Sequence, residues 1–214
     1  QSFLHSVDRT IKLRGLSHLG TRKKGQNYDK VMLFAGLDKI LRHYNKHDIF
    51  VSLIHADNEF RSLFNMLADD WDISFNYCLP GEHVPDIERY NRLLQERFRV
   101  TLYCLPYKVI PRLMIVKLAL RITRIANFFP AKGGISQHYP TATIVSGKQI
   151  DFNKELVYSF GDYVQAYYES RPKNNNLPRT KDCIYLQSTD TLQRGHELMD
   201  LSTGELIRCT RVDK

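Results

Sequence analysis

The sequence has few of the features that mark membrane, disulfide-rich or zinc-binding proteins. No apolar run reaches the roughly 18 residues of a membrane-spanning helix, because the longest candidate, residues 109–126, contains Pro111 and four basic residues. The four cysteines form no C-x-x-C pair and have no zinc-ligand spacing, which predicts buried free thiols in a reducing compartment. Nothing at Gln1 resembles a secretory signal, and a start without Met leads us to expect a fragment or a processed product.

Familiar catalytic patterns are also missing. No Ser/His/Asp or Cys/His set, no phosphate-cradling glycine loop and no internal repeat is present. At 214 residues, with 43% hydrophobic and 25% charged residues, the chain is long enough for one large globular domain or two smaller ones.

Positive charge is concentrated at the start of the chain. The net charge is +8, and residues 1–47 hold ten basic residues against three acidic ones. Clustered positive charge attracts polyphosphates such as nucleic acid. A solvated basic surface that serves solubility explains the charge equally well, and charge alone leaves both readings open.

Hydrophobic periodicity predicts a mixed α/β arrangement followed by a small β domain. We expect strands at residues 2–6, 10–16, 49–54 and 72–77, and helices at 28–47, 59–68, from 85 to before Pro106, and at 111–128. After residue 152 the pattern changes to short strands, at 158–170, 182–187 and 196–211, separated by turn-rich segments. These features predict domains at residues 1–150 and 155–214, the second a small antiparallel barrel.

Two acidic residues form the candidate site. Asp57 follows the apolar run at 49–54, and Glu88, thirty-one positions later, lies about one turn into a predicted helix. An acid at a strand end and an acid on a helix can hold Mg²⁺ between them, since this ion usually takes one or two protein carboxylates. With twenty-three acidic residues in the chain, a loop residue and a helix-start acid are the competing interpretation.

Polar and basic side chains continue from Glu88 along the same predicted helix, and three more follow on the next. Side chains at this spacing could contact successive phosphates of a DNA backbone. A polar helix face that is simply exposed to solvent would have the same sequence pattern. The candidate DNA contacts are Asn91, Arg92, Gln95, Arg99, Lys117, Arg121 and Arg124. His55 is read as a strand-end residue rather than a base.

Several motifs, in order, resemble the integrase region of copia-type LTR-retrotransposon polyproteins. Val7-Asp8-Arg9 is similar to a strand segment of integrase cores, residues 57–60 resemble the Asp-Asn-Gly-x-Glu-Phe motif, and residues 82–94 resemble the segment ending in Glu-Arg-x-Asn-Arg-x-Leu. Residues 127–136 resemble the loop that follows. Residues 160–164 and 201–207 look like the start and the closing hairpin of an SH3-like β domain.

The resemblance implies a ribonuclease-H-like core that uses Mg²⁺ or Mn²⁺, two-metal type, for DNA 3′-end processing and strand transfer. It carries Asp57 and Glu88 over as the second and third metal-binding acids. It also implies DNA as partner, a homo-multimer on DNA, and a nuclear site of action with a cytoplasmic particle stage, without secretion or a membrane.

The chain also departs from the family. The first acid would lie on a strand before Ser2, and Asp8 is no substitute because that position is not catalytic in the family. The glycine after Asn58 is missing, the Asp57–Glu88 spacing is shorter than usual, and the preceding His/His/Cys/Cys zinc domain is absent. We therefore expect impaired catalysis. A catalytically dead nucleic-acid-binding relic and a ribonuclease-H-like nuclease acting on hybrids remain alternatives.

Overall fold

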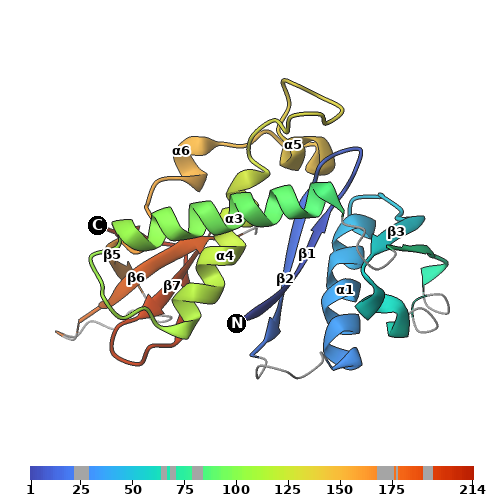
Figure 1. Ribbon diagram of the computed structural model, residues 1–214. Helices are drawn as coiled ribbons and strands as arrows, with labels where there is room; N and C mark the ends of the chain where they lie inside the picture. The colour runs from blue at the N-terminus through green and yellow to red at the C-terminus, as the bar shows by residue number, and fades with distance from the viewer. Residues whose placement is uncertain are drawn as a thin grey trace. The chain divides into compact units, whose positions relative to one another are not determined.

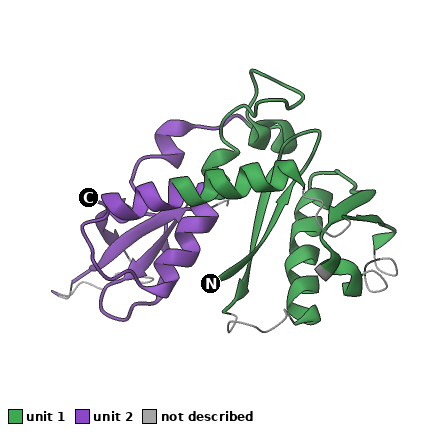
Figure 2. Ribbon diagram, in the orientation of Figure 1, with its two compact units in different colours: residues 1–96, 123–148 green, residues 97–122, 149–214 purple. Residues whose placement is uncertain are grey.

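The structure, a computed structural model, describes residues 1–21, 29–63, 67, 71–78, 84–167, 176, 178–189 and 195–214, with only the backbone at Glu59. It divides into two compact units (Figure 2). Unit 1 comprises residues 1–96 and 123–148, and unit 2 comprises residues 97–122 and 149–214. The domain division at 1–150 and 155–214 stays a prediction. Among the described residues, no helix has both the length and the apolar character to cross a membrane.

Unit 1 begins with an antiparallel hairpin of β1 (Ser2–Val7) and β2 (Arg14–Gly20) (Figure 1). The Asp8 carboxylate accepts hydrogen bonds from the backbone N–H groups of Thr10, at 2.8 Å, and Ile11, and Lys12 has a φ of 63°. This turn chemistry occupies the residues at which the sequence predicted the second strand to begin, so that prediction was wrong by four residues.

The helix α1 (Lys30–Asn45) covers one face of this hairpin. Asp29 caps its start by accepting from the Val31 N–H at 3.0 Å. Its buried stripe packs with Leu4 and Leu19 in one core. Gly36 permits the close approach, because a Cβ there would lie 2.6 Å from Leu19 Cδ2. The predicted helix is thus confirmed, slightly shortened at both ends.

The strands β3 (Leu53–Ala56) and β4 (Ser74–Tyr77) form a parallel pair, and the 3₁₀ helix η1 (Asn58–Leu63) follows β3. The prediction of a buried strand at residues 49–54 was wrong. Only its last two residues lie in β3, and Phe50, before the strand begins, is 79% exposed. Ile49, Val51 and Ile54 still pack against the core.

Two long helices, α3 (Pro85–Cys104) and α4 (Arg112–Ala126), contribute residues to both units, and both were predicted. Within unit 1, the Tyr90 hydroxyl and Thr123 Oγ1 form a buried hydrogen bond of 2.6 Å. The Tyr90 ring lies 5.7 Å from the ring of His5, whose neighbour Leu4 faces the α1 core. The first turns of α3 therefore cover the face of the hairpin opposite α1.

Among the described residues, the strands of unit 1 form two separate two-stranded sheets rather than the single mixed sheet that the sequence predicted. Unit 1 also contains a short helix that was not predicted, α5 (Thr141–Ser146), as unit 2 contains α6 (Phe152–Glu155).

Unit 2 contains a five-stranded antiparallel sheet in the order β8-β7-β6-β5-β9. Its core includes Val164, Ala166, Tyr185 and Leu198. The strands are β5 (Tyr163–Tyr167), β6 (Thr180–Ser188), β7 (His196–Asp200), β8 (Leu206–Cys209) and β9 (Val212–Asp213). The structure thus shows a mixed α/β chain with an antiparallel sheet, and the SH3-like barrel stays a prediction.

The four cysteines are all free thiols. Cys183 and Cys209 are buried, Cys78 is half-buried and Cys104 is exposed, so the expectation of buried thiols holds for only part of the set. Burial raises the pKa of the Cys183 and Cys209 thiols to about 11, which disfavours the reactive thiolate.

Candidate metal and nucleic-acid site

Asp57 lies directly after β3, where the chain turns into η1. Its backbone carbonyl accepts from the Phe60 N–H at 3.0 Å, which begins the 3₁₀ helix and fixes the position of the residue. Its carboxylate side chain is exposed. The carboxyl end of a parallel strand is where α/β sheets commonly place their ligand-binding residues.

Glu88 lies in the first turn of α3. Its N–H donates to the Val84 carbonyl at 3.2 Å, and Asp86 in the same turn pairs with Lys12 at 3.3 Å. Acidic residues are favoured at this end of a helix by the helix dipole. The Lys12–Asp86 contact attaches the helix start to the turn of the β1–β2 hairpin, which supports the position of Glu88.

A cavity of about 780 Å³ lies in unit 1. Asp57 and Glu88 both line it, although they come from different elements and are thirty-one positions apart. Asp8, His55, Asp86 and Asn91 line the same cavity. Asp8 Oδ1 accepts from the turn amides and Asp86 Oδ1 pairs with Lys12, so one oxygen of each carboxylate already has a partner.

The donor set fits a hard divalent cation in part. Carboxylate oxygens are the ligands that Mg²⁺ prefers, and one or two from the protein are usual. Asp57 and Glu88 could supply these two. Within the described residues, however, no group of three or more His, Cys, Asp or Glu side chains is arranged to hold a metal ion.

Sequence reasoning missed a polar cluster around His55. The His55 ring lies between Arg9, 3.3 Å from Nε2, and the Asn76 amide, 3.3 Å from Nδ1. A guanidinium can only donate, so the Nε2 lone pair of His55 accepts. The signal was present in the sequence, since Arg9 follows the turn residue Asp8 and His55 lies two residues before Asp57, but their contact crosses forty-six positions.

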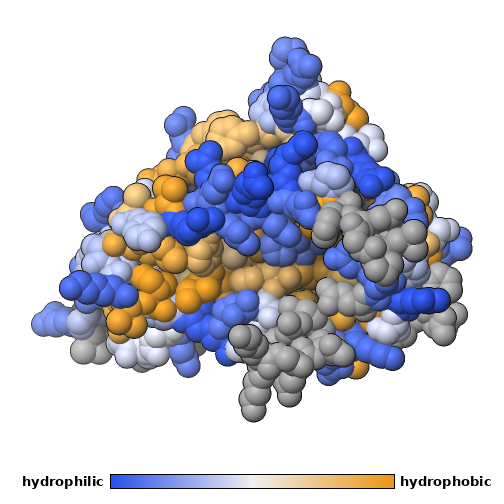
Figure 3. All heavy atoms as spheres, viewed as in Figure 1, coloured by the Kyte–Doolittle hydropathy of each residue, from blue (hydrophilic) through white to orange (hydrophobic). Residues whose placement is uncertain are grey.

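Four of the predicted DNA contacts lie on α3. Arg92, Gln95 and Arg99 are exposed, and Asn91 is half-buried with its Oδ1 lacking a hydrogen-bond partner among the described residues. The surface along the N-terminal half of this helix is hydrophilic (Figure 3). Asn91, Arg92 and Gln95 belong to unit 1, and Arg99 to unit 2.

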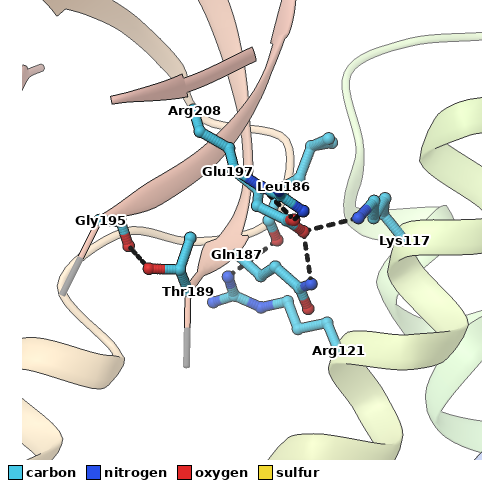
Figure 4. Close-up of polar contacts among 8 residues, drawn as sticks. All are labelled: Lys117, Arg121, Leu186, Gln187, Thr189, Gly195, Glu197 and Arg208. Carbon is cyan, nitrogen blue, oxygen red and sulfur yellow. Dashed lines mark hydrogen bonds and ion pairs between the residues drawn. The ribbon is translucent and has the colours of Figure 1, made fainter. Parts of the chain in front are cut away.

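The predicted contacts on α4 have partners within their own units. Lys117 Nζ lies 2.6 Å from Glu197 Oε2, and Arg121 donates to the Leu186 carbonyl at 3.0 Å (Figure 4). Arg121 also donates to the Tyr158 carbonyl at 2.8 Å. In unit 1, the Arg124 guanidinium lies over the Phe128 ring at 5.6 Å. These contacts give each cation a structural role, and whether any of them also contacts DNA stays a prediction.

Glu197 is the centre of the contacts in Figure 4. It is buried, and it accepts from Gln187 at 2.7 Å and from Arg208 at 2.8 Å as well as from Lys117. Burial alone would raise the pKa of Glu197, but these hydrogen bonds outweigh burial and the pKa is lowered. Its carboxylate is therefore kept ionised inside unit 2, where it attaches α4 to the sheet.

Comparisons with known proteins add little to this geometry. No protein-family model matches the sequence, and no curated protein matches it. A solved structure, the cryoEM structure of the simian T-cell lymphotropic virus intasome in complex with PP2A regulatory subunit B56 gamma, contains a chain that aligns over 97% of this chain and 73% of its own length. The identity is 12% and the TM-score is 0.49. A likeness at this level assigns neither activity nor residue roles to the chain.

Proposed function

We propose that this chain is an integrase core with a ribonuclease-H-like fold and a following SH3-like β domain, from a copia-type LTR-retrotransposon polyprotein. Its activity would be metal-dependent DNA 3′-end processing and strand transfer. The observation that carries the proposal is the shared cavity, which Asp57 and Glu88 both line from two separate elements. The ordered motifs of the sequence support the same assignment.

The proposed chemistry gives each residue a limited role. When bound, Mg²⁺ or Mn²⁺ supplies Lewis-acid polarisation of a phosphoryl oxygen and a nucleophile at neutral pH. Asp57 and Glu88 provide its protein oxygens. Arg9, held against His55, lines the same cavity as Asp57, and its guanidinium would bind a phosphodiester there. Asn91, Arg92, Gln95 and Arg99 would continue the DNA contacts along α3.

Catalysis by this chain is expected to be weak. The resemblance calls for three acids, but Asp8 and Asp86, which share the cavity, are engaged by other partners. DNA as partner, assembly as a homo-multimer on DNA and a nuclear site of action belong to the same proposal.

Nicking of supercoiled plasmid DNA in Mn²⁺ tests the proposal. We expect slow nicking that Asp57→Asn and Glu88→Gln each abolish and that Glu96→Gln, an exposed acid further along α3, leaves unchanged. Activity that persists in Asp57→Asn would contradict the assignment.

A non-enzymatic nucleic-acid-binding protein of the same fold is the second candidate. The lack of a three-acid group among the described residues favours it, together with the basic segment at residues 1–47. This candidate predicts DNA or RNA binding in EDTA, equal for the parent chain and Asp57→Asn, with no nicking in Mn²⁺.

A further inference from the structure

Two histidines lie one helical turn apart at the end of α1. His43 is the third-last residue of the helix, and His47 follows two residues after its end. The centroids of their rings are 5.2 Å apart, and the ring planes are inclined at 77°. His43 is exposed and His47 is half-buried. Residues four apart on a helical path project from the same side, so the two imidazoles lie next to each other at the surface of unit 1.

The backbone that carries these rings is fixed by the way in which α1 ends. His47 N–H donates to the Tyr44 carbonyl at 2.9 Å, which extends the helical path beyond the last residue of α1. Asp48, with a φ of 56°, and Ile49, whose N–H donates to the same carbonyl at 3.2 Å, close the helix as in a Schellman motif. The Tyr44 side chain is buried in the core. The folded chain therefore sets the spacing between His43 and His47.

The spacing of the two rings suits one metal ion. An imidazole nitrogen binds Zn²⁺ at about 2.0–2.1 Å, so two imidazoles on one ion have centroids roughly 5 Å apart. The observed 5.2 Å agrees with this spacing, so binding requires rotation of the side chains and no movement of the helix. Two histidines at positions i and i+4 are also the arrangement in which a helix supplies two ligands to zinc in metalloproteases.

The chemistry of imidazole determines which ions can bind. Neutral imidazole suits Zn²⁺, Cu²⁺ and Ni²⁺, and the affinity of such a site rises from Mn²⁺ to Cu²⁺. Mg²⁺ and Mn²⁺ instead prefer carboxylate and water oxygens. A pair of histidines therefore selects a different class of ion from the pair of acids at Asp57 and Glu88.

The charges around the two rings permit a cation. The end of a helix carries partial negative charge, and the Asp48 carboxylate adds to it. Arg42 pairs with Asp38 at 2.7 Å, which offsets its own charge. Lys39 and Lys46 are exposed, so salt screens their repulsion of a bound ion.

We propose that His43 and His47 form a surface site for one Cu²⁺, Ni²⁺ or Zn²⁺ ion, in which each residue gives one ring nitrogen and water fills the other positions. With two protein ligands, the site binds more weakly than a structural zinc site, which has four. The inference does not depend on integrase activity, because neither histidine lines the cavity that Asp57 and Glu88 share.

Titration of the full chain with Cu²⁺, followed by electron paramagnetic resonance at about pH 8, tests the site, since metal ligands must be deprotonated. We expect one-to-one binding with couplings from two imidazole nitrogens. His43→Ala and His47→Ala should each weaken it by at least about tenfold. Two controls should bind as the parent does, His138→Ala, which removes an exposed histidine elsewhere in unit 1, and Asp57→Asn.

Two rescue variants test the spacing itself. In the His47→Ala protein, Lys39→His provides a second imidazole one turn before His43 and is expected to restore Cu²⁺ binding. In the same background, Asn45→His provides it two residues from His43, where side chains do not face each other, and is expected not to restore binding. Lys39 and Asn45 are both exposed, so these changes leave the core intact.

Urea unfolding in Zn²⁺ gives a second readout. At a free Zn²⁺ concentration about 100 times the Kd, the folding equilibrium constant of the parent should rise by about 100-fold, and that of the two alanine variants should not. Cu²⁺ binding that is equal in the parent and both alanine variants would overturn the proposal. Binding that Asn45→His restores as well as Lys39→His does, or that shows no imidazole coupling, would overturn it too.

Discussion

At the scale of single residues, the basic side chains of α4 have structural roles that their charge pattern did not predict. Lys117, Arg121 and Arg124 share a helical face by spacing, which predicted a basic surface. The structure places Lys117 against Glu197 and buries Arg121 beneath two carbonyls of unit 2. Their partners lie up to eighty positions away, so no pattern within the helix could reveal them. For Asp57 and Glu88, local signals predicted their places after a strand and in the first turn of a helix, and their role as metal ligands stays a prediction.

Removing Lys117 should destabilise the protein. In Lys117→Met, Glu197 stays buried with only Gln187 and Arg208 as partners, and removal of one member of a buried pair typically costs about 3 kcal/mol. Urea unfolding measures the loss. Lys154→Met, which removes a surface pair with Asp151, should cost less than about 1 kcal/mol. Equal costs for both variants would mean that Lys117 has no special role.

Asp200 should make stability depend on acidity. Hydrogen bonds from Ser202 and Lys181 lower its pKa to about 2, below the value of an unfolded chain. Its contribution is therefore complete above about pH 4 and is lost as the pH falls toward 2, where the folded state must also be protonated. The free energy of unfolding, measured at several pH values across this window, should change less with pH in Asp200→Asn than in the parent. Asp213→Asn, at an exposed site, should retain the parent slope.

At the scale of elements, helices were easier to predict than strands. The long helices α1, α3 and α4 follow clear apolar stripes, and their bounds agree with the sequence to within a few residues. Strand prediction failed where hydrogen bonds between a side chain and the backbone set the start of a strand. The turn at Asp8 extends over the residues that were predicted to begin β2, so that β2 begins later in the chain. It failed again at residues 49–54, because apolar content predicts burial but does not say which strand pairs where.

The hydrogen bond between α3 and α4 offers a test at this scale. Tyr90→Phe removes the 2.6 Å hydrogen bond to Thr123 Oγ1 and should cost about 1 kcal/mol. The double variant Tyr90→Phe with Thr123→Val should cost less than the sum of the two single losses, because each single change already removes the shared bond. Thermal or urea unfolding of the parent, both single variants and the double variant measures the coupling, and additive losses would show that the two hydroxyls do not interact.

At the scale of the whole molecule, charge and acid placement carry the proposed function. The net charge of +8 favours a polyanionic partner, and the two candidate metal ligands lie in the unit that also contains the basic N-terminal segment. Composition alone leaves a polyanionic partner and a solvated basic surface both open, and only the folded chain shows that Asp57 and Glu88 line one cavity.

DNA binding should weaken steeply with salt. If about six phosphates are contacted, affinity should fall by about a thousandfold between 50 and 200 mM salt. Fluorescence anisotropy with a labelled duplex measures the slope. Arg92→Gln should remove about one phosphate contact and so reduce the slope of log affinity against log salt by about one. A slope near zero would show that the chain does not bind DNA through its phosphates.

Asp57 and Glu88 are proposed to bind a divalent cation, and titration with Mn²⁺ followed by calorimetry or electron paramagnetic resonance measures that binding. We expect saturable binding that Asp57→Asn and Glu88→Gln each weaken by at least about tenfold, while Glu96→Gln binds as the parent does. Mn²⁺ binding that is absent, or that is equal in all four proteins, would show that these two carboxylates are not the metal ligands.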